Sequence, residues 1–266
     1  MDNTRVSAQR KVLYLGKQLG LASEEGYKPS DVSAAVRGEH RARKQLANYQ
    51  NNLERIYKKA LEITDAEVTG IDLDPDWLHN FFQMAEQIHS PKMQELWARI
   101  LAKEVVNPGN FSIHTLTTLK QLTQREAQVL EKALSLACTT NNETRLKLIN
   151  GYRLTGGLAL YFRKTPKIQL DLSQFGLPYS NILSLINAGI IHPEELETGL
   201  LTKGQEVQVT FARDQHVYIP KRHHLLIRYY RLTAIGNELA QLVTPKQDNK
   251  FTATINKLFN KDFIIS

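Results

Sequence analysis

The chain of 266 residues is long enough for two modest domains, because domains most often contain roughly 100 to 150 residues. Its hydrophobic content of 42%, with 8% aromatic residues, is ordinary for a globular protein and argues against wholesale disorder. The net charge of +7 points to acidic partners, although it says nothing about the fold.

The single cysteine, Cys138, excludes an intramolecular disulfide, and the first residues lack the apolar core of a secretory signal. No uncharged apolar run approaches the roughly 20 residues that span a bilayer as a helix. The sequence therefore predicts a cytoplasmic protein without integral membrane association.

Residues 1–65 form the first predicted region, which contains one long helix. Apolar side chains recur there with alternating spacings of three and four residues, which is the pattern of a heptad seam. The seam consists of Leu46, Tyr49, Leu53, Ile56, Ala60 and Ile63. Two interpretations stay open: the helix packs its stripe on its own chain, or it pairs with a second copy in a homo-oligomer.

Residues 66–140 are predicted to form a compact helical module. Asp74-Pro75 and Ser90-Pro91 each combine an N-capping side chain with a proline suited to the first helical position. The run from Thr123 to Glu126 is a capping box, and an apolar stripe follows it. Short helices with conventional starts account for this region.

The stretch from Gln94 to Ser112 holds charged pairs, a tryptophan and a serine, and we interpret it as a packing module. Trp97 falls on the apolar stripe of a helix predicted from residue 91 to residue 106. Glu104 lies seven residues later on the same stripe. It is either a buried functional carboxylate or an edge residue that reaches solvent or caps a neighbouring backbone.

The segment MQELWARILAKE, residues 93–104, precedes Pro108-Gly109 and Phe111-Ser112. With these residues it resembles a module of uncharacterised bacterial cytoplasmic proteins. The likeness covers residues 74–135, and it extends distantly to the Abi-alpha group associated with abortive infection. The resemblance implies a phage-defence or regulatory setting, and it carries over no catalytic residue.

Residues 141–245 are predicted to form a winged-helix-like α+β domain. The pattern of residues 171–191, a short helix, a turn and a second helix, is typical of a helix-turn-helix. Alternating apolar residues from Val207 to Ile219 predict a hairpin, residues 225–229 predict a third strand, and a helix follows from residue 231 to residue 243. The predicted fold class is thus mainly α, with a long N-terminal helix, a compact helical module and a C-terminal winged-helix-like domain.

The tail, residues 246–266, is amphipathic, with Phe251, Ile255 and Phe259 at helical spacing and lysines around them. Such a segment docks on its own protein, on a partner or on a membrane surface. Docking on its own chain is the expectation, because a short amphipathic segment more often packs than anchors.

Basic side chains concentrate in the predicted ribbon between residues 203 and 231. They are Lys203, Arg213, Lys221, Arg222, Arg228 and Arg231. In a nucleic-acid binder these side chains would neutralise phosphates, and in the alternative they only keep a strand face soluble. The predicted second helix of the helix-turn-helix, Tyr179 to Asn187, contains no Arg or Lys, which argues against extensive base reading.

No signature of catalysis, cofactor binding or metal binding stands out. The run from Asp72 to Trp77 begins like a calcium loop, but Trp77 replaces the required glycine. With one cysteine, the adjacent His223-His224 pair does not predict a zinc site. The sequence predicts a non-enzymatic binding protein: a nucleic-acid- or ribonucleoprotein-associated regulator, or alternatively an adaptor or self-assembling component of a phage-defence system.

Overall fold

The computed structural model describes residues 7–18, 21, 33–64, 70, 72–141, 143–156, 167–212, 214–244 and 246–266. The chain divides into two compact units. One consists of Met1–Ala66 with Leu78–Ala102, and the other of Glu67–Trp77 with Lys103–Ser266.

Helices are the regular elements of the first unit among its described residues. It contains α1 (Ala8–Gln18), α2 (Ala34–Ile63) and most of α3 (Pro75–Ala85) and α4 (Pro91–Val106). The N-terminal half of α2 is almost entirely exposed, and only its C-terminal half buries side chains, at Asn52, Ile56 and Ala60. Ile56 and Ala60 belong to the predicted heptad seam, whereas Asn52 does not, and the helix packs on its own chain over these last turns.

A polar contact holds α2 at this packed end. The Asn52 side chain donates a hydrogen bond to the Glu86 carbonyl oxygen at 2.8 Å and accepts one from the Gln94 amide at 3.1 Å. Asn52 and Gln94 are both buried, so these bonds satisfy groups that would otherwise be costly to bury.

The core of the first unit confirms the packing interpretation of Trp97. Its side chain is fully buried, and its ring lies 5.2 Å from that of the equally buried Phe81, measured between centroids. The i, i+4 pair Glu95 and Arg99 lies on the exposed face of the same helix, with 2.6 Å between charged atoms.

The second unit contains most of the remaining helices and all the strands in the described residues. Its helices are α5 (Ile113–Gln121), α6 (Gln124–Ser135), the 3₁₀ helix η2 (Leu172–Phe175), α7 (Tyr179–Asn187), α8 (Ala234–Ala240) and α9 (Asn249–Phe259). The predicted capping box at the start of α6 is confirmed, because Thr123 and Glu126 exchange their side-chain to backbone hydrogen bonds.

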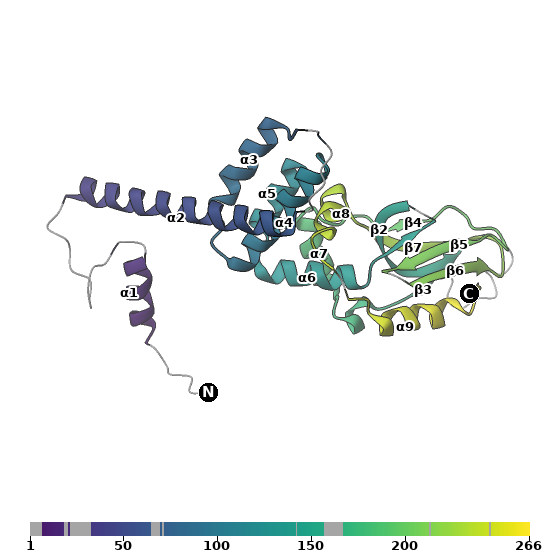
Figure 1. Ribbon diagram of the computed structural model, residues 1–266. Coiled ribbons are helices and arrows are strands. Elements are labelled where there is room, and N and C mark those ends of the chain that lie inside the picture. The colour runs from purple at the N-terminus through teal and green to yellow at the C-terminus, as the bar shows by residue number, and fades with distance from the viewer. Residues whose placement is uncertain are drawn as a thin grey trace. The chain divides into compact units, whose positions relative to one another are not determined.

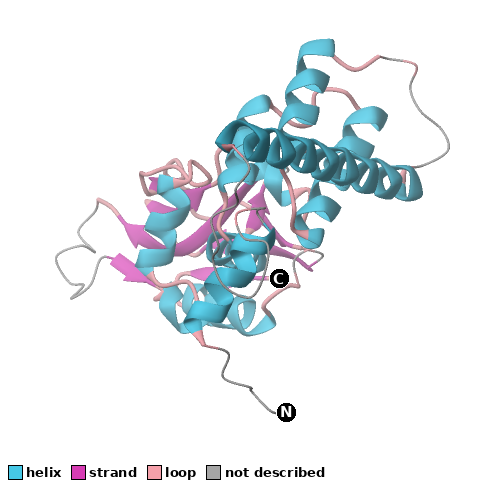
Figure 2. Cartoon of the chain, turned by 90° about the vertical axis from the view of Figure 1, so that its left-hand side faces the viewer, coloured by secondary structure: helices cyan, strands magenta, loops and turns pink. Residues whose placement is uncertain are grey.

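Eight strands in the described residues form one sheet, in which every neighbouring pair is antiparallel (Figure 2). They are β1 (Cys138–Thr140), β2 (Glu143–Leu154), β3 (Lys167–Gln169), β4 (Leu196–Glu197), β5 (Val207–Phe211), β6 (Asp214–Pro220), β7 (Leu225–Arg231) and β8 (Phe263–Ile265). The order across the sheet is β4-β7-β2-β1-β5-β6-β8, and β3 also pairs with β2.

This sheet shows that the fold class predicted from the sequence is wrong: the chain is mixed α/β, not mainly α with a C-terminal winged-helix-like domain. The predicted hairpin of β5 and β6 and the predicted strand β7 all form. However, β7 pairs with β2 and β4, while β6 pairs with β5 and β8. The hairpin therefore has no third strand of a wing beside it, because the unpredicted strands β1 and β2 separate it from β7.

The tail forms α9 and β8, and the prediction that it docks on its own chain is confirmed. In Figure 1, α9 lies along the sheet. Phe251, Ile255 and Phe259 are fully buried, and the Phe259 ring lies 4.9 Å from that of Tyr152 on β2. The chain then continues into β8, which extends the sheet beside β6.

Glu104 is a buried carboxylate that organises the turn after α4. Its two oxygens accept hydrogen bonds from the backbone N–H groups of Gly109 at 2.5 Å and Phe111 at 2.9 Å. Glu238 of α8 accepts the next N–H group, that of Ser112, at 2.7 Å. Burial raises the pKa of Glu104 against the lowering effect of these N–H groups, and the Glu238 carboxylate raises it further. Glu104 thus caps a neighbouring backbone, one of the two roles expected for it.

Trp97→Ala should lower the free energy of unfolding by about 3 to 5 kcal/mol, because it removes a large, fully buried aromatic ring. The matched change Glu95→Ala on the exposed face should cost about half a kcal/mol or less. Urea melts of both variants measure this difference, and equal midpoints would contradict the packing role.

The loss in free energy of unfolding caused by Glu104→Gln should become smaller as the pH rises. The pKa of Glu104 is raised above its ordinary value of 4.5. Its contribution to the free energy of unfolding is therefore fully present below pH 4.5 and is lost as the pH rises through the raised pKa. Glutamine does not titrate, so the stability difference between wild type and variant should narrow from pH 4 to about pH 8. Urea melts across this range test the sign, and a widening difference would contradict it.

Candidate functional site

Three turns meet at one end of the sheet of the second unit. The Gly204 N–H group donates to the Pro220 carbonyl oxygen at 3.0 Å, and the Lys203 N–H group donates to Nδ1 of His223 at 3.3 Å. The Lys221 N–H group donates to the Asp262 carbonyl oxygen at 2.8 Å. These bonds join turns that are up to about sixty residues apart in the sequence.

The three turns carry six exposed cationic or titratable side chains, which we call the basic patch. Its members are Lys203, Lys221, Arg222, His223, His224 and Lys261. Nζ of Lys221 donates to the Asn260 carbonyl oxygen at 2.6 Å, and among the described residues Lys221 forms no ion pair. Arg222 lies 3.2 Å from a carboxylate oxygen of the buried Asp262 and is still 45% exposed. The patch therefore presents donors and positive charge to solvent.

The backbone of the patch has one unusual conformation. His224 has a φ of 65°, in the left-handed region that residues with a Cβ seldom adopt. Its N–H group donates to the Leu201 carbonyl oxygen at 3.0 Å, and its carbonyl oxygen accepts from the Thr155 N–H group at 2.9 Å. Bonds on both sides hold the turn in this conformation and fix where its side chains project.

The structure brings together three of the six predicted basic residues, Lys203, Lys221 and Arg222, and separates them from two others. Arg228 is buried and forms ion pairs with Glu195 and with Glu197. Arg231 pairs with Glu143 at 3.1 Å. The sixth predicted residue, Arg213, lies outside the described residues. Arg228 and Arg231 therefore serve first as partners of carboxylates.

The predicted oligomerisation residues lie along α2 in differing environments. Ile56 is 1% exposed inside its own unit, Tyr49 and Leu53 are half-buried, and Leu46 and Ile63 are exposed. The exposed apolar side chains of α2 also include Tyr57 and Leu61, which are four residues apart and thus neighbours on the helix surface.

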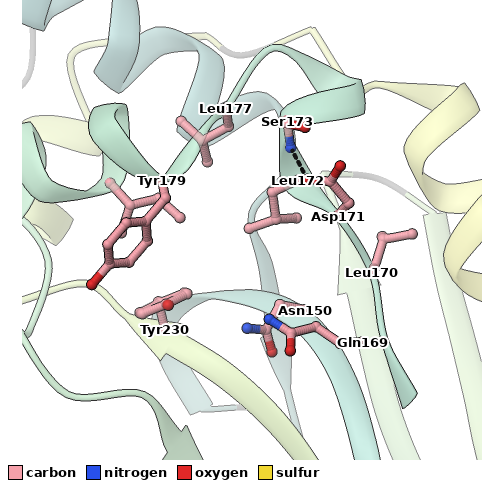
Figure 3. Close-up of a pocket in the computed structure, with 10 residues that line it drawn as sticks. Asn150, Gln169, Leu170, Asp171, Leu172, Ser173, Leu177, Tyr179 and Tyr230 are labelled. Atoms are coloured by element: carbon pink, nitrogen blue, oxygen red, sulfur yellow. Dashed lines mark hydrogen bonds between the residues drawn. The ribbon is translucent and has the colours of Figure 1, made fainter.

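A cavity of about 330 Å³ opens beside the start of α7, within the second unit (Figure 3). Its polar and aromatic lining comes from Asn150, Gln169, Asp171, Ser173, Tyr179 and Tyr230, and its apolar lining from Leu170, Leu172, Leu177 and Ile182. In Figure 3, Tyr179 and Tyr230 lie on one side of the cavity and Leu172 and Asp171 on the other. Such a mixture of apolar walls and few polar groups is typical of small-molecule sites.

The cavity depends on a β-bulge in β2. The register with β7 shifts between Ile149 and Gly151, and Gly151 has a φ of 154°. A Cβ at this position would collide with the carbonyl oxygen of Ile168 on β3, so only glycine lets β3 approach so closely. The bulge places the side chain of Asn150 in the cavity lining.

A network of charged side chains lies behind Asn150. Its side-chain amide donates to Glu195, which pairs with Arg228, and Glu197 bridges Arg228 and Arg153. Burial lowers the pKa of the Arg228 guanidinium. Since the Asn150 amide nitrogen faces Glu195, its Oδ1 faces away, and this buried oxygen has no hydrogen-bond partner among the described residues.

Tyr230 shares the electrostatic environment of this network. Burial raises the pKa of its phenol, and the neighbouring Glu195 carboxylate and the Tyr179 phenol raise it further. Tyr230 is half-buried, whereas Tyr179 is 63% exposed at the mouth of the cavity. The cavity is thus lined by one half-buried aromatic ring, that of Tyr230, and one exposed ring, that of Tyr179.

Sequence reasoning missed this cavity, although one signal was present. Asn150-Gly151 stands inside a run of otherwise strand-like residues, and an isolated glycine in such a run indicates a bulge or a close backbone approach. Eight of the ten lining residues lie between residues 169 and 182, but Asn150 on β2 and Tyr230 on β7 are distant in the sequence, so no local motif could gather the whole lining.

The described part of the chain shows neither a metal-binding cluster nor a membrane-spanning helix. It contains no group of three or more His, Cys, Asp or Glu side chains placed to hold a metal ion. None of its helices is both long enough and apolar enough to cross a bilayer.

Fold and patch together define a mixed α/β chain with an antiparallel sheet and a basic cluster at one end of it. Residues 36–256 match the family described as "Protein of unknown function (DUF2806)", and the chain belongs to this family. The match confirms the predicted membership in an uncharacterised family and lends no support to the likeness to the Abi-alpha group. No curated protein and no solved structure matches the chain.

Gly151→Ala should lower the free energy of unfolding by about 1 to 3 kcal/mol or more, because alanine is strained at this φ and its Cβ would collide with the carbonyl oxygen of Ile168. Gly199→Ala is the control, since the space around Gly199 is open. Thermal melts of both variants test the bulge, and an unchanged melting temperature for Gly151→Ala would show that β3 does not pack against it.

Proposed function

We propose that this chain is a non-enzymatic nucleic-acid-binding regulator that contacts phosphates through the basic patch. The observation that carries the proposal is the convergence of Lys203, Lys221, Arg222 and Lys261 on three turns tied together by hydrogen bonds. The proposed setting is the cytoplasm, where the buried thiol of Cys138, with its pKa raised by burial to about 12, would stay protonated and inert.

The patch suits phosphates because its charge is exposed and only partly compensated. Among the described residues, Asp262 alone forms an ion pair with a member of the patch, and its side chain is fully buried beneath Arg222. Lysine and arginine side chains on loops can follow a flexible phosphate backbone, and backbone contacts of this kind carry affinity without sequence information.

Base reading by α7 forms no part of the proposal. This helix has no Arg or Lys, and Leu185 and Ile182 are buried in the unit. Binding through the patch alone should therefore be sequence-tolerant and strongly dependent on salt.

Replacing Lys203 and Lys261 together with glutamine should weaken binding to a labelled single-stranded oligonucleotide. Each lost phosphate contact should reduce the slope of log K against log salt by about 0.7. Fluorescence anisotropy at several salt concentrations measures both effects. Both lysine side chains are exposed, and their removal leaves the Arg222–Asp262 pair intact.

The control is the double change Arg125→Gln and Lys250→Gln, which removes the same charge from exposed positions on α6 and α9. It should leave the salt slope unchanged. Absence of wild-type binding at low salt, or equal weakening by both double variants, would contradict a specific role of the patch.

A second candidate function is that of a protein-interaction adaptor or self-assembling component, including one of a phage-defence system. The exposed apolar side chains of α2 favour it: Leu46 is 66% exposed, Leu61 is 61% exposed and Tyr57 is 54% exposed. Large apolar residues gathered on an exposed helix are typical of contact surfaces.

Leu46→Glu combined with Leu61→Glu should convert an assembled species into a monomer, if α2 pairs between copies. Light scattering coupled to size exclusion measures the mass at about tens of micromolar, where weak helical pairs assemble. Asn51→Glu adds charge at an exposed polar position of the same helix and should leave the mass unchanged. A wild-type monomer at this concentration would rule out self-assembly through α2.

A further inference from the structure

We propose that the cavity beside α7 is a nucleobase site, which accepts one unstacked base that carries an exocyclic amino group. This inference deepens the proposed function, on which it rests, by adding a second contact of another chemical kind. The basic patch would hold phosphates, and the cavity would hold a base.

The size and walls of the cavity fit a planar heteroaromatic ring. Its volume of about 330 Å³ lies within the range of small-molecule sites, and four apolar side chains line it. Tyr179 stands at the mouth with 63% of its surface exposed, so its ring is available for stacking. Aromatic stacking is the usual way in which proteins hold single-stranded bases, because every base has a π-face.

The polar groups of the cavity favour a base that donates hydrogen bonds. Oδ1 of Asn150 is a buried acceptor without a partner in the described part of the chain, and its lone pairs make the adjoining cavity wall electronegative, which favours a ligand N–H group there. Glu195 orients the amide so that this oxygen, and not the nitrogen, is left over. The Asp171 carboxylate, whose pKa is lowered by hydrogen bonds from Ser173, adds a second acceptor.

Gln169 completes the set, because its exposed side chain on β3 can both accept and donate. Paired donor and acceptor groups of this kind match the amino edge of adenine, which Asn and Gln side chains recognise. The negative charge of Asp171 disfavours a phosphate inside the cavity, so the base and not the backbone would enter.

The cavity and the basic patch are linked by β7. His224 of the patch directly precedes this strand, and Tyr230 of the cavity lies six residues further on, about 20 Å along an extended chain. One single strand of a few nucleotides could therefore reach both sites.

The test uses the full-length protein and two kinds of probe. Adenosine and uridine, which have no phosphate, are titrated while the backbone amide signals of the cavity residues are followed by NMR. Labelled oligo(A), oligo(U) and an abasic strand of equal length are titrated by fluorescence anisotropy. The variants are Tyr179→Ala and Gln169→Ala, both at exposed positions, with Tyr14→Ala of α1 as the exposed-tyrosine control.

The expected result is that adenosine shifts the cavity signals and uridine does so more weakly. Tyr179→Ala should weaken oligo(A) binding at least about fivefold, the smaller end of the loss on removing one stacking ring. It should leave abasic-strand binding unchanged, and Tyr14→Ala should leave the binding of all strands unchanged. Gln169→Ala should reduce the preference for oligo(A) over oligo(U).

Each other outcome decides between the two proposals. If oligonucleotides bind and lose affinity only in the Lys203 and Lys261 variant, the nucleobase site is overturned and the basic patch stands. If adenosine shifts the cavity signals but no strand binds at low salt, the base site is supported and the phosphate-binding patch is overturned. Adenosine that shifts no cavity signal at millimolar concentration overturns the base site.

Discussion

The second unit depends on strand β2, and in particular on the bulge that Gly151 permits in it. This strand pairs with β1, β3 and β7, so the centre of the sheet is built on it. Gly151 lets β3 approach where a side chain would collide with the Ile168 carbonyl oxygen. The bulge then places Asn150 in the cavity lining, on the side where Glu195 and Arg228 meet. The packing of β3 and the candidate base site thus both depend on the bulge at Gly151.

Carboxylates decide which basic residues are available for a partner. Arg228 and Arg231 have Glu195, Glu197 and Glu143 as neighbours, so much of their charge is compensated inside the protein. In the basic patch, the buried Asp262 pairs with Arg222, while the lysines project to solvent. Because a paired and buried guanidinium is costly to separate from its carboxylate, the exposed lysines are the better phosphate ligands.

Backbone N–H groups decide the role of the carboxylates around residues 109–112. Glu104 and Glu238 accept hydrogen bonds from the turn that follows α4, and Glu238 comes from the distant helix α8. The turn is therefore tied to an element more than a hundred residues away, which joins the N-terminal and C-terminal parts of the second unit. A buried carboxylate here serves packing, and its raised pKa is a consequence of that burial.

The sequence by itself determined the local elements whose signals are short-range. Capping at Thr123 and Glu126, the apolar stripe around Trp97, the alternation in β5 and β6 and the amphipathic tail depend on neighbours a few residues apart, and each forms as predicted. Only the tertiary structure decided which strands pair. The central strand β2 was not predicted, because Asn150-Gly151 interrupts its apolar pattern. It also decided that Lys203 and Lys261 lie on turns that both bond to the turn at residues 220–223, while Arg228 is buried in ion pairs, since hydrogen bonds and ion pairs between distant segments set the exposure of a charge.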